Sequence, residues 1–295
     1  MSPPRGRAEL AITITAFLWG STFTVVKEAL HDISTFLFLA LRFTAGALLL
    51  LAVYRGRFSS KGNPRVFWQA GLVTGSLLFL GYALQTTGLR LTTASKSAFL
   101  TGLYIVLVPL FASALSRRAP RSVELAGAVA GSAGTALLSG QASNWSLGSG
   151  EWLTVGCAAA FAAHMLAVEH YSRRMSYELL AVLQVAAVGA FSLLTMPLLE
   201  TPRAVWSGRV WFALALTAVF ATAVSFALYT WAQRHTSATR AALLFSLEPV
   251  FAGVVAWFAA GEIWTFRMLC GAALILSGIL MVEWKPYRPL ISPLQ

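Results

Sequence analysis

The chain has 295 residues, of which 57% are hydrophobic and only 11% are charged, and its mean hydropathy is +0.70. This composition excludes a soluble globular domain and predicts an all-α integral membrane protein. A net charge of +11 would suggest nucleic-acid binding in a soluble chain, but here most basic residues lie in the connections between apolar runs. We therefore expect the lipid bilayer as a partner and no nucleic acid.

Ten apolar runs are each long enough to cross a bilayer, whose hydrocarbon core takes about 20 helical residues to span. They cover approximately residues 10–30, 34–54, 66–88, 97–116, 122–140, 152–171, 179–199, 209–233, 241–260 and 266–284. The connections that remain are too short to hold a separate catalytic or regulatory domain.

A segment in the first half of the chain recurs in the second half. Residues 81–138 match residues 225–282 without a gap, at an offset of 144 residues. Matched Thr, Arg and Gly carry the most weight, because Ala and Leu match by chance in an apolar chain. Self-similarity at one offset indicates a duplicated unit. Five spans per copy is an odd number, so the second copy enters the membrane in the opposite orientation.

These features predict ten transmembrane helices arranged as two inverted five-helix repeats around a central cavity. We place the first repeat at 1–140, a linker rich in Gly and Ser at 141–150, and the second repeat at 151–295. Inverted repeats are a common plan of secondary transporters, which bind substrate near the midplane where the halves meet.

The first span carries Trp19 and Thr22 on one helical face. Helix packing explains such a face, but a mid-span indole needs a hydrogen-bond acceptor, so a cavity position is an equal alternative. The second span contains Arg42 near its middle, and Gln184 holds the corresponding place in the seventh. We interpret both as structural polar residues, with substrate contact by Arg42 as the alternative.

Polar stripes mark the third span and its repeat partner, the eighth. Tyr82 and Gln85 lie on one face of the third span, and Ser225 and Tyr229 lie on one face of the eighth. Interhelical hydrogen bonding is one explanation. We favour two walls of a shared aqueous cavity, because Tyr and Gln are bulky for close helix packing.

Thr101 and Tyr104 share a face of the fourth span, and the repeat places Glu248 of the ninth span in the position of Tyr104. This intramembrane carboxylate could bind a substrate ammonium group, carry a coupling proton, or pair with the arginine of the second span. Pro109 and Pro249 predict one proline-broken helix in each repeat, as hinges or as static kinks.

His164 in the sixth span is a candidate ligand for a proton or a substrate, whereas Glu169 is interpreted as an interface residue. Two cysteines lie inside apolar runs, so we expect no metal site and no cofactor. Gly127 and Gly131 form a small-xxx-small pair that could join helices within one protomer or in a homodimer, with a monomer as the alternative.

Basic residues predict the orientation. With a cytoplasmic N-terminus, the outer connections hold only Lys27, Arg90, Lys96, Arg203, Arg209 and Arg267, whereas the inner ones hold Arg5, Arg7, Arg55, Arg57, Lys61, Arg65, Arg117, Arg118, Arg121, Arg173, Arg174, Arg234, Arg240, Lys285 and Arg288. The excess inside predicts a multi-pass protein of the bacterial inner membrane with both termini in the cytoplasm.

The chain resembles the EamA branch of the drug/metabolite transporter superfamily. The resemblance rests on Trp19-Gly20-Ser21, Leu41-Arg42-Phe43, Ala98-Phe99-Leu100-Thr101 with Val108-Pro109, Gln184, Glu248-Pro249-Val250, Gly261-Glu262 and the segment from Gly271 to Gly278. It implies the ten-helix architecture, a central cavity, and export of amino acids or other small metabolites.

We therefore expect an alternating-access exporter, with amino acids as the leading substrate class, and no catalytic residues. Its predicted substrate-binding residues are Trp19, Thr22, Tyr82, Gln85, Thr101, Tyr104, His164, Ser225, Tyr229 and Glu248. A passive facilitator or channel is the first alternative. An intramembrane hydrolase is the second, and it would need a nucleophile within reach of a base, for which His164 is the one mid-span histidine.

Overall fold

The computed structural model describes residues 5–58, 63–117, 119–138, 148–260 and 265–283. Most of the expected linker at 141–150 lies outside these residues. So do the pair Gly261-Glu262 and four of the basic residues used to assign orientation, namely Lys61, Arg118, Lys285 and Arg288. The described residues are helical apart from their connections, and they contain one isolated β-bridge, between Ile33 and Ala204, and no strand.

The first half of the chain forms α1 (Arg5–Gly20), α2 (Phe23–Ala29), α3 (Thr35–Tyr54), α4 (Pro64–Leu91), α5 (Ala94–Thr101), α6 (Tyr104–Ser116) and α7 (Ser122–Leu138). The second half forms α8 (Ser149–Ser172), α9 (Tyr177–Leu199), α10 (Gly208–Leu216), the π-helical segment η2 (Thr217–Val224), α11 (Ser225–Gln233), α12 (Ala238–Phe245), α13 (Glu248–Ala260) and α14 (Phe266–Glu283).

Eight helical segments of the described chain are long and apolar enough to cross a membrane. Two further helices, Ser122–Leu138 and Phe266–Val282, are also apolar but shorter. The prediction of an all-α integral membrane protein is confirmed. Several boundaries follow from local capping. The Asn63 side chain accepts a hydrogen bond from the backbone N–H of Arg65 at the start of α4, and Ser207 caps α10 in the same way.

Two of the expected spans are divided in equivalent places. A turn at Gly102 and Leu103 separates α5 from α6, and a turn at Ser246 and Leu247 separates α12 from α13. The expectation that Pro109 breaks the fourth span is wrong, because this proline lies inside α6. Pro249 is the second residue of α13, where its missing N–H costs no internal hydrogen bond.

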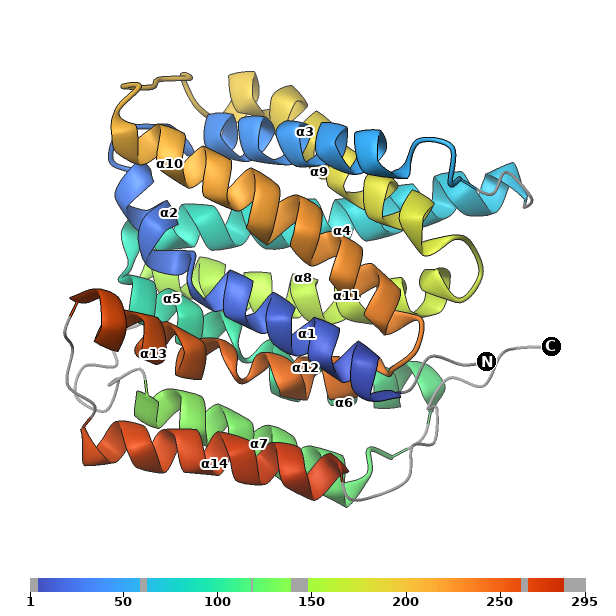
Figure 1. The fold of residues 1–295 in the computed structure, drawn as a ribbon, viewed down its shortest axis with the longest axis vertical. Helices are drawn as coiled ribbons and strands as arrows, with labels where there is room; N and C mark the ends of the chain where they lie inside the picture. The colour runs from blue at the N-terminus through green and yellow to red at the C-terminus, as the bar shows by residue number, and fades with distance from the viewer. Residues whose placement is uncertain (1–4, 59–62, 118, 139–147, 261–264, 284–295) are drawn as a thin grey trace.

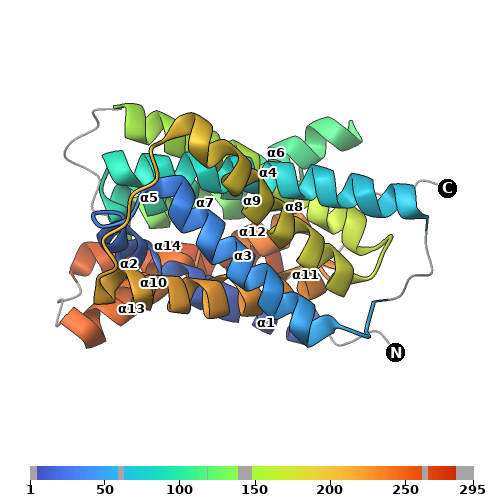
Figure 2. The ribbon, with the colours of Figure 1, turned by 90° about the horizontal axis from the view of Figure 1, so that it is seen from above.

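Helices from the two halves lie against each other throughout the molecule. Figure 1 shows α7 and α14 side by side at one edge and α3 with α9 and α10 at the opposite edge, while Figure 2 shows the same bundle from above. A Cβ atom added at Gly134 would lie 2.5 Å from the carbonyl oxygen of Gly271, and one added at Gly127 would lie 2.9 Å from that of Gly278. The backbones of α7 and α14 therefore approach closely within one chain.

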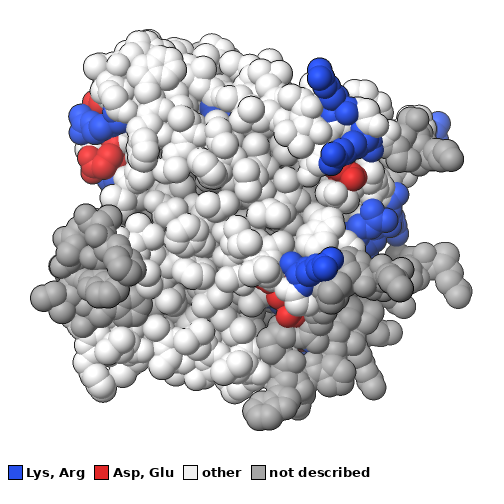
Figure 3. Space-filling view, viewed as in Figure 1, with Lys and Arg blue, Asp and Glu red and all other residues white. Residues whose placement is uncertain are grey.

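The surface shows how the molecule would sit in a bilayer. Charged side chains gather toward the two ends of the helices, and a broad face between them carries almost none (Figure 3). Large apolar residues such as Leu48, Trp68 and Leu198 are exposed on the surface, at 61%, 77% and 81%. Lipid contact accounts for such exposure, because apolar side chains face hydrocarbon in a multi-pass membrane protein.

Candidate functional site

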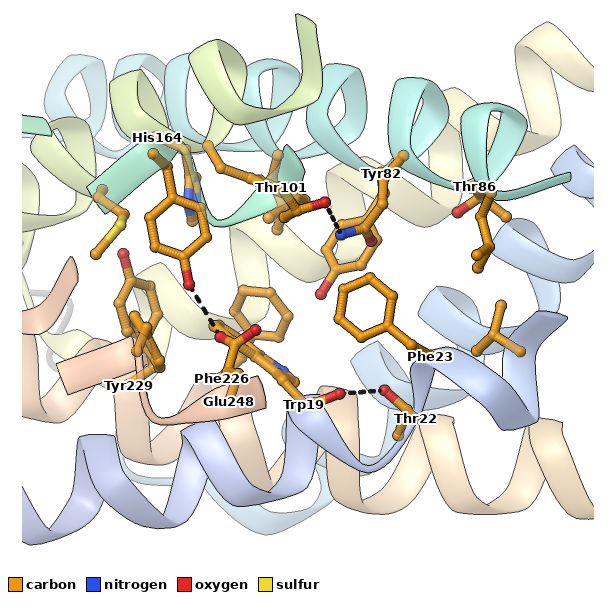
Figure 4. A pocket seen from close by; sticks show the side chains of 18 of the residues that line it. Trp19, Thr22, Phe23, Tyr82, Thr86, Thr101, His164, Phe226, Tyr229 and Glu248 are labelled. Carbon is orange, nitrogen blue, oxygen red and sulfur yellow. Dashed lines mark hydrogen bonds between the residues drawn. The ribbon is translucent and has the colours of Figure 1, made fainter. Parts of the chain in front are cut away.

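A cavity lies among helices of both halves. It measures about 730 Å³, including the part that is open to solvent. Its walls come from α1, α2, α3, α4, α5, α6, α8, α11, α12 and α13, through the side chains of Trp19, Thr22, Phe23, Val26, Arg42, Leu78, Tyr82, Gln85, Thr86, Leu89, Thr101, Tyr104, Phe161, His164, Met165, Phe226, Tyr229, Phe245 and Glu248. Figure 4 shows Phe23 and Thr86 toward one end and His164 and Tyr229 toward the other.

The structure brings nine of the ten predicted site residues together around this cavity. The tenth, Ser225, is fully buried away from the cavity, and its hydroxyl donates to the carbonyl oxygen of Phe220 on its own helix. Its neighbour Phe226 takes the place in the wall. That the nine residues bind a substrate stays a prediction.

Glu248 is the carboxylate of the cavity wall. The hydroxyl of Tyr104 donates to its Oε1 over 3.0 Å (Figure 4). Each of the two residues begins a half-helix, Tyr104 that of α6 and Glu248 that of α13, and they are equivalent under the 144-residue repeat. No basic side chain of the described residues lies within ion-pair distance of Glu248.

Arg42 is the cation of the same wall. It is only 4% exposed, its Nε donates to the hydroxyl of Thr222 over 3.0 Å, and its guanidinium lies 4.9 Å from the Tyr82 ring centroid and 5.0 Å from that of Phe43. The alternative in which Arg42 pairs with Glu248 is wrong, since the described part of the chain places no carboxylate within 4 Å of the guanidinium. Arg42 is both a structural link to η2 and part of the cavity wall.

Aromatic rings enclose the Glu248 side of the cavity. The Trp19 ring stacks on Phe245 at a centroid distance of 5.0 Å and lies 5.8 Å from the Tyr229 ring. The indole N–H of Trp19 donates to the carbonyl oxygen of Ala221 in η2 over 2.8 Å, which supplies the acceptor that a mid-span tryptophan requires. This bond fixes the ring between α1 and the eighth span.

Hydrogen bonds also hold the polar residues on the α8 side. His164 Nε2 lies 2.8 Å from Gln184 Oε1, and Gln184 Nε2 donates to the Thr230 hydroxyl over 2.8 Å. Because the amide oxygen of Gln184 is the acceptor in this arrangement, His164 carries its proton on Nε2. Gln184 itself is fully buried outside the cavity wall, as expected of a structural polar residue.

Sequence reasoning missed two central aromatic residues, although the repeat contained the signal. Adding 144 to Tyr82 gives Phe226, and adding it to Thr101 gives Phe245. Both phenylalanines line the cavity, but a search for polar side chains in apolar spans does not find them. Apolar members of the wall such as Leu78 and Met165 carry no pattern that separates them from packing residues.

The described residues hold no group of three or more His, Cys, Asp or Glu side chains that could bind a metal ion. Cys157 and Cys270 are free cysteines. The Cys157 sulfur lies 3.6 Å from the Thr101 hydroxyl, to which Gln85 Nε2 donates over 3.3 Å. These contacts place the thiol in a packing and hydrogen-bonding role.

Comparisons with known proteins agree with this architecture. An uncharacterized transporter of Archaeoglobus fulgidus is 33% identical over 280 residues, covering 94% of this chain and 86% of its own. A chloroplastic WAT1-related protein of Arabidopsis thaliana is 28% identical over 284 residues, covering 91% of this chain and 67% of its own. The uncharacterized transporter YoaV of Bacillus subtilis is 23% identical over 293 residues, with 92% and 95% covered.

A solved crystal structure with 23% sequence identity shares the fold, with a TM-score of 0.78 over 94% of this chain and 96% of that chain. The profile of the EamA-like transporter family matches the chain twice, at residues 6–140 and at residues 148–284. The two matches together cover nearly all of the sequence. The chain is a member of the EamA-like transporter family, within the drug/metabolite transporter superfamily.

Proposed function

We propose that this transporter exports small metabolites, with amino acids as the leading class, by alternating access to a site between two inverted five-helix repeats. The observation that carries the proposal is that one cavity holds a basic and an acidic side chain that are not paired with each other. Arg42 and Glu248 both line it, and neither has an opposite charge within 4 Å among the described residues.

A buried charge without a counter-charge destabilises a protein, so a ligand that supplies both missing charges gains free energy at each pole. A zwitterion does this: its carboxylate suits the fork of the Arg42 guanidinium, and its ammonium group suits Glu248. The aromatic rings of Trp19, Tyr229 and Phe245 would contact the apolar part of the ligand and the ammonium group.

Reciprocal contacts between the two copies of the repeat support the inverted arrangement. Gly127 approaches Gly278, and Gly134 approaches Gly271, while the repeat pairs Gly127 with Gly271 and Gly134 with Gly278. Such crossed, reciprocal contacts are what a pseudo-two-fold axis produces. The hydrogen bond between the equivalent residues Tyr104 and Glu248 fits the same axis.

Access from one side at a time is the second part of the proposal. We call the end of the molecule at which α1 begins the near end, and the end at which α2 ends the far end. The cavity wall includes Phe23 and Val26 of α2, which ends at the far end, whereas all residues of α12 are buried. We infer that the cavity opens toward the far end and that α12 closes it toward the near end. From the excess of basic residues at the near end, we infer that this end faces the cytoplasm.

Binding of matched ligands tests the substrate class. We would follow the melting temperature of purified protein with leucine, with isoamylamine, which lacks the carboxylate, and with 4-methylpentanoate, which lacks the ammonium group. The expected result is that leucine binds at least about tenfold more tightly than either analogue, because each analogue leaves one charged pole without a partner. Equal binding of all three would contradict the zwitterion site.

Flux into liposomes tests the mechanism. Leucine trapped inside reconstituted vesicles should accelerate uptake of labelled leucine, because a carrier that alternates between two sides exchanges one bound solute for another. Uptake that neither saturates nor responds to trapped solute would indicate a passive channel instead. Chemical conversion of the solute by the purified protein would indicate an enzyme.

A further inference from the structure

The near end of α8 is tied to the start of α12 by a buried carboxylate. Glu169 is only 5% exposed, and its Oε2 accepts a hydrogen bond over 2.9 Å from the backbone N–H of Ala238, the first residue of α12. Its Oε1 lies 3.0 Å from Arg173 Nη2, which also lies 3.4 Å from the carbonyl oxygen of Thr236. We call Glu169, Arg173, Thr236 and Ala238 the clasp. Glu169 lies near the end of α8, and its side chain is buried against α12.

The helix that the clasp holds, α12, reaches from the clasp to the cavity wall. All residues of α12 are buried, from Ala238 at the clasp to Phe245 in the cavity wall. Phe245 stacks on Trp19, so the far end of α12 is held by aromatic contact and its near end by the clasp. Because every residue of α12 is packed, a path along this helix toward the near end can open only if α12 moves.

The equivalent helix of the first half has different surroundings. The repeat pairs Ala238 with Ala94, and so α12 with α5. At the start of α5, Thr93 and Ser95 are exposed, whereas their equivalents Ser237 and Thr239 are 9% and 6% exposed. Two copies of one unit thus differ in burial, with the near-end copy enclosed and the far-end copy partly open.

Two buried side-chain oxygens, one in the clasp and one in α11, favour movement of α12 away from its closed position. Gln233 Oε1 and Thr236 Oγ1 have no hydrogen-bond partner among the described residues. Removing such oxygens from water without a donor destabilises the enclosed arrangement, and movement of α12 would allow them to be hydrated. The bonds of Glu169 to Ala238 and Arg173 oppose that movement.

We propose that the clasp is the gate of the near end: its bonds hold α12 closed while the cavity is accessible from the far end, and they break before a ligand passes to or from the near end. This inference rests on the proposed alternating-access function. It assigns Glu169 a positioning role in transport through α12, without contact between Glu169 and the ligand.

Hydrogen–deuterium exchange of the amides in residues 236–245 tests the gate. In Glu169→Ala, we expect these amides to exchange at least about tenfold faster than in the wild type, because the loss of a buried charged acceptor favours local opening. If the alanine variant does not fold, Glu169→Gln keeps one acceptor oxygen for Ala238 but loses the ion pair with Arg173, and a smaller acceleration in the same segment is expected.

Glu151 on the same helix provides the matched control. It accepts a hydrogen bond over 2.6 Å from the hydroxyl of Thr92 and lies 3.7 Å from Lys96, at the equivalent turn of the far end. Glu151→Ala should accelerate exchange in residues 92–101 and leave residues 236–245 as in the wild type. Exchange in α7 and α14 should be unchanged in both variants, which shows that each remains folded.

Two exchange results would overturn the gate. One is wild-type exchange of residues 236–245 in a folded Glu169→Ala protein, and the other is equal acceleration of that segment by Glu151→Ala. Solute flux into vesicles distinguishes a failure of the gate from a failure of the proposed transport function. If wild-type vesicles move no solute, the proposed function is wrong, whereas wild-type flux together with wild-type exchange in the variant overturns the gate alone.

Discussion

At the scale of single residues, Glu248 offers the sharpest substitution. In Glu248→Gln, the amide oxygen still accepts from Tyr104, but the side chain can no longer ionise to pair with an ammonium group, so we expect leucine binding to weaken at least about tenfold. Without ligand, the melting temperature should stay the same or rise, because glutamine keeps the acceptor for Tyr104 and never carries a charge that needs a partner. Titration of the melting temperature with leucine measures both effects.

The matched control for this substitution is Glu28→Gln. Glu28 is 53% exposed and lies 3.7 Å from Arg209 at the surface, so its loss should leave leucine binding unchanged. A Glu248→Gln protein that binds leucine as tightly as the wild type would remove Glu248 from the site.

Arg42→Gln tests the opposite pole. The variant can keep a hydrogen bond to Thr222 but loses the guanidinium charge, so leucine and 4-methylpentanoate should both bind at least about tenfold more weakly, while isoamylamine binds as before. Only the two ligands that carry a carboxylate should lose affinity. If Arg42 had a purely structural role, binding of all three ligands would weaken alike. Melting curves with each ligand separate the two outcomes.

At the scale of elements, the contact between α7 and α14 is the most constrained. A Cβ atom at Gly134 would lie 2.5 Å from the carbonyl oxygen of Gly271 and 2.7 Å from Ile275 Cγ1, so Gly134→Ala forces two backbones apart. Overpacking of this kind costs about 1 to 3 kcal/mol. We expect a lower melting temperature for Gly134→Ala.

Gly131→Ala is the control on the same helix. A Cβ atom added at Gly131 would lie 3.5 Å from its nearest neighbours, the Cβ and Oγ atoms of Ser246, which is ordinary van der Waals contact. The variant should melt close to the wild type. Equal melting of the two variants would show that α7 and α14 are not in close contact in the membrane.

The bounds of most helices could be predicted from the sequence, whereas the breaks within spans and the contacts between helices could not. Hydropathy placed the second span at 34–54 and the eighth at 209–233, against Thr35–Tyr54 and Gly208–Gln233 in the structure. Hydropathy does not locate the turn at Gly102. The nearest proline, Pro109, is a misleading signal for the break because it lies inside α6. The clasp was missed because the binding of Glu169 to a backbone N–H in α12 leaves no trace in residue types.

At the scale of the whole molecule, orientation is the property to test. Helix α1 begins and α14 ends at the same end of the bundle (Figure 1), and that near end carries the larger share of basic residues. Green fluorescent protein fused to the C-terminus should therefore fluoresce, because it matures in the cytoplasm, and alkaline phosphatase in its place should be inactive. The opposite pattern would reverse the orientation and the proposed direction of export.

The hydrogen bond between Tyr104 and Glu248 has an evolutionary consequence. If the two matched regions descend from one ancestral segment, both positions once held the same residue, and near a two-fold axis the two copies would have faced each other. Two carboxylates there would have repelled, and two phenols would have offered no charge to a ligand. Under that descent, the acid–phenol pair arose by divergence of the two copies, which a single chain that carries both copies allows.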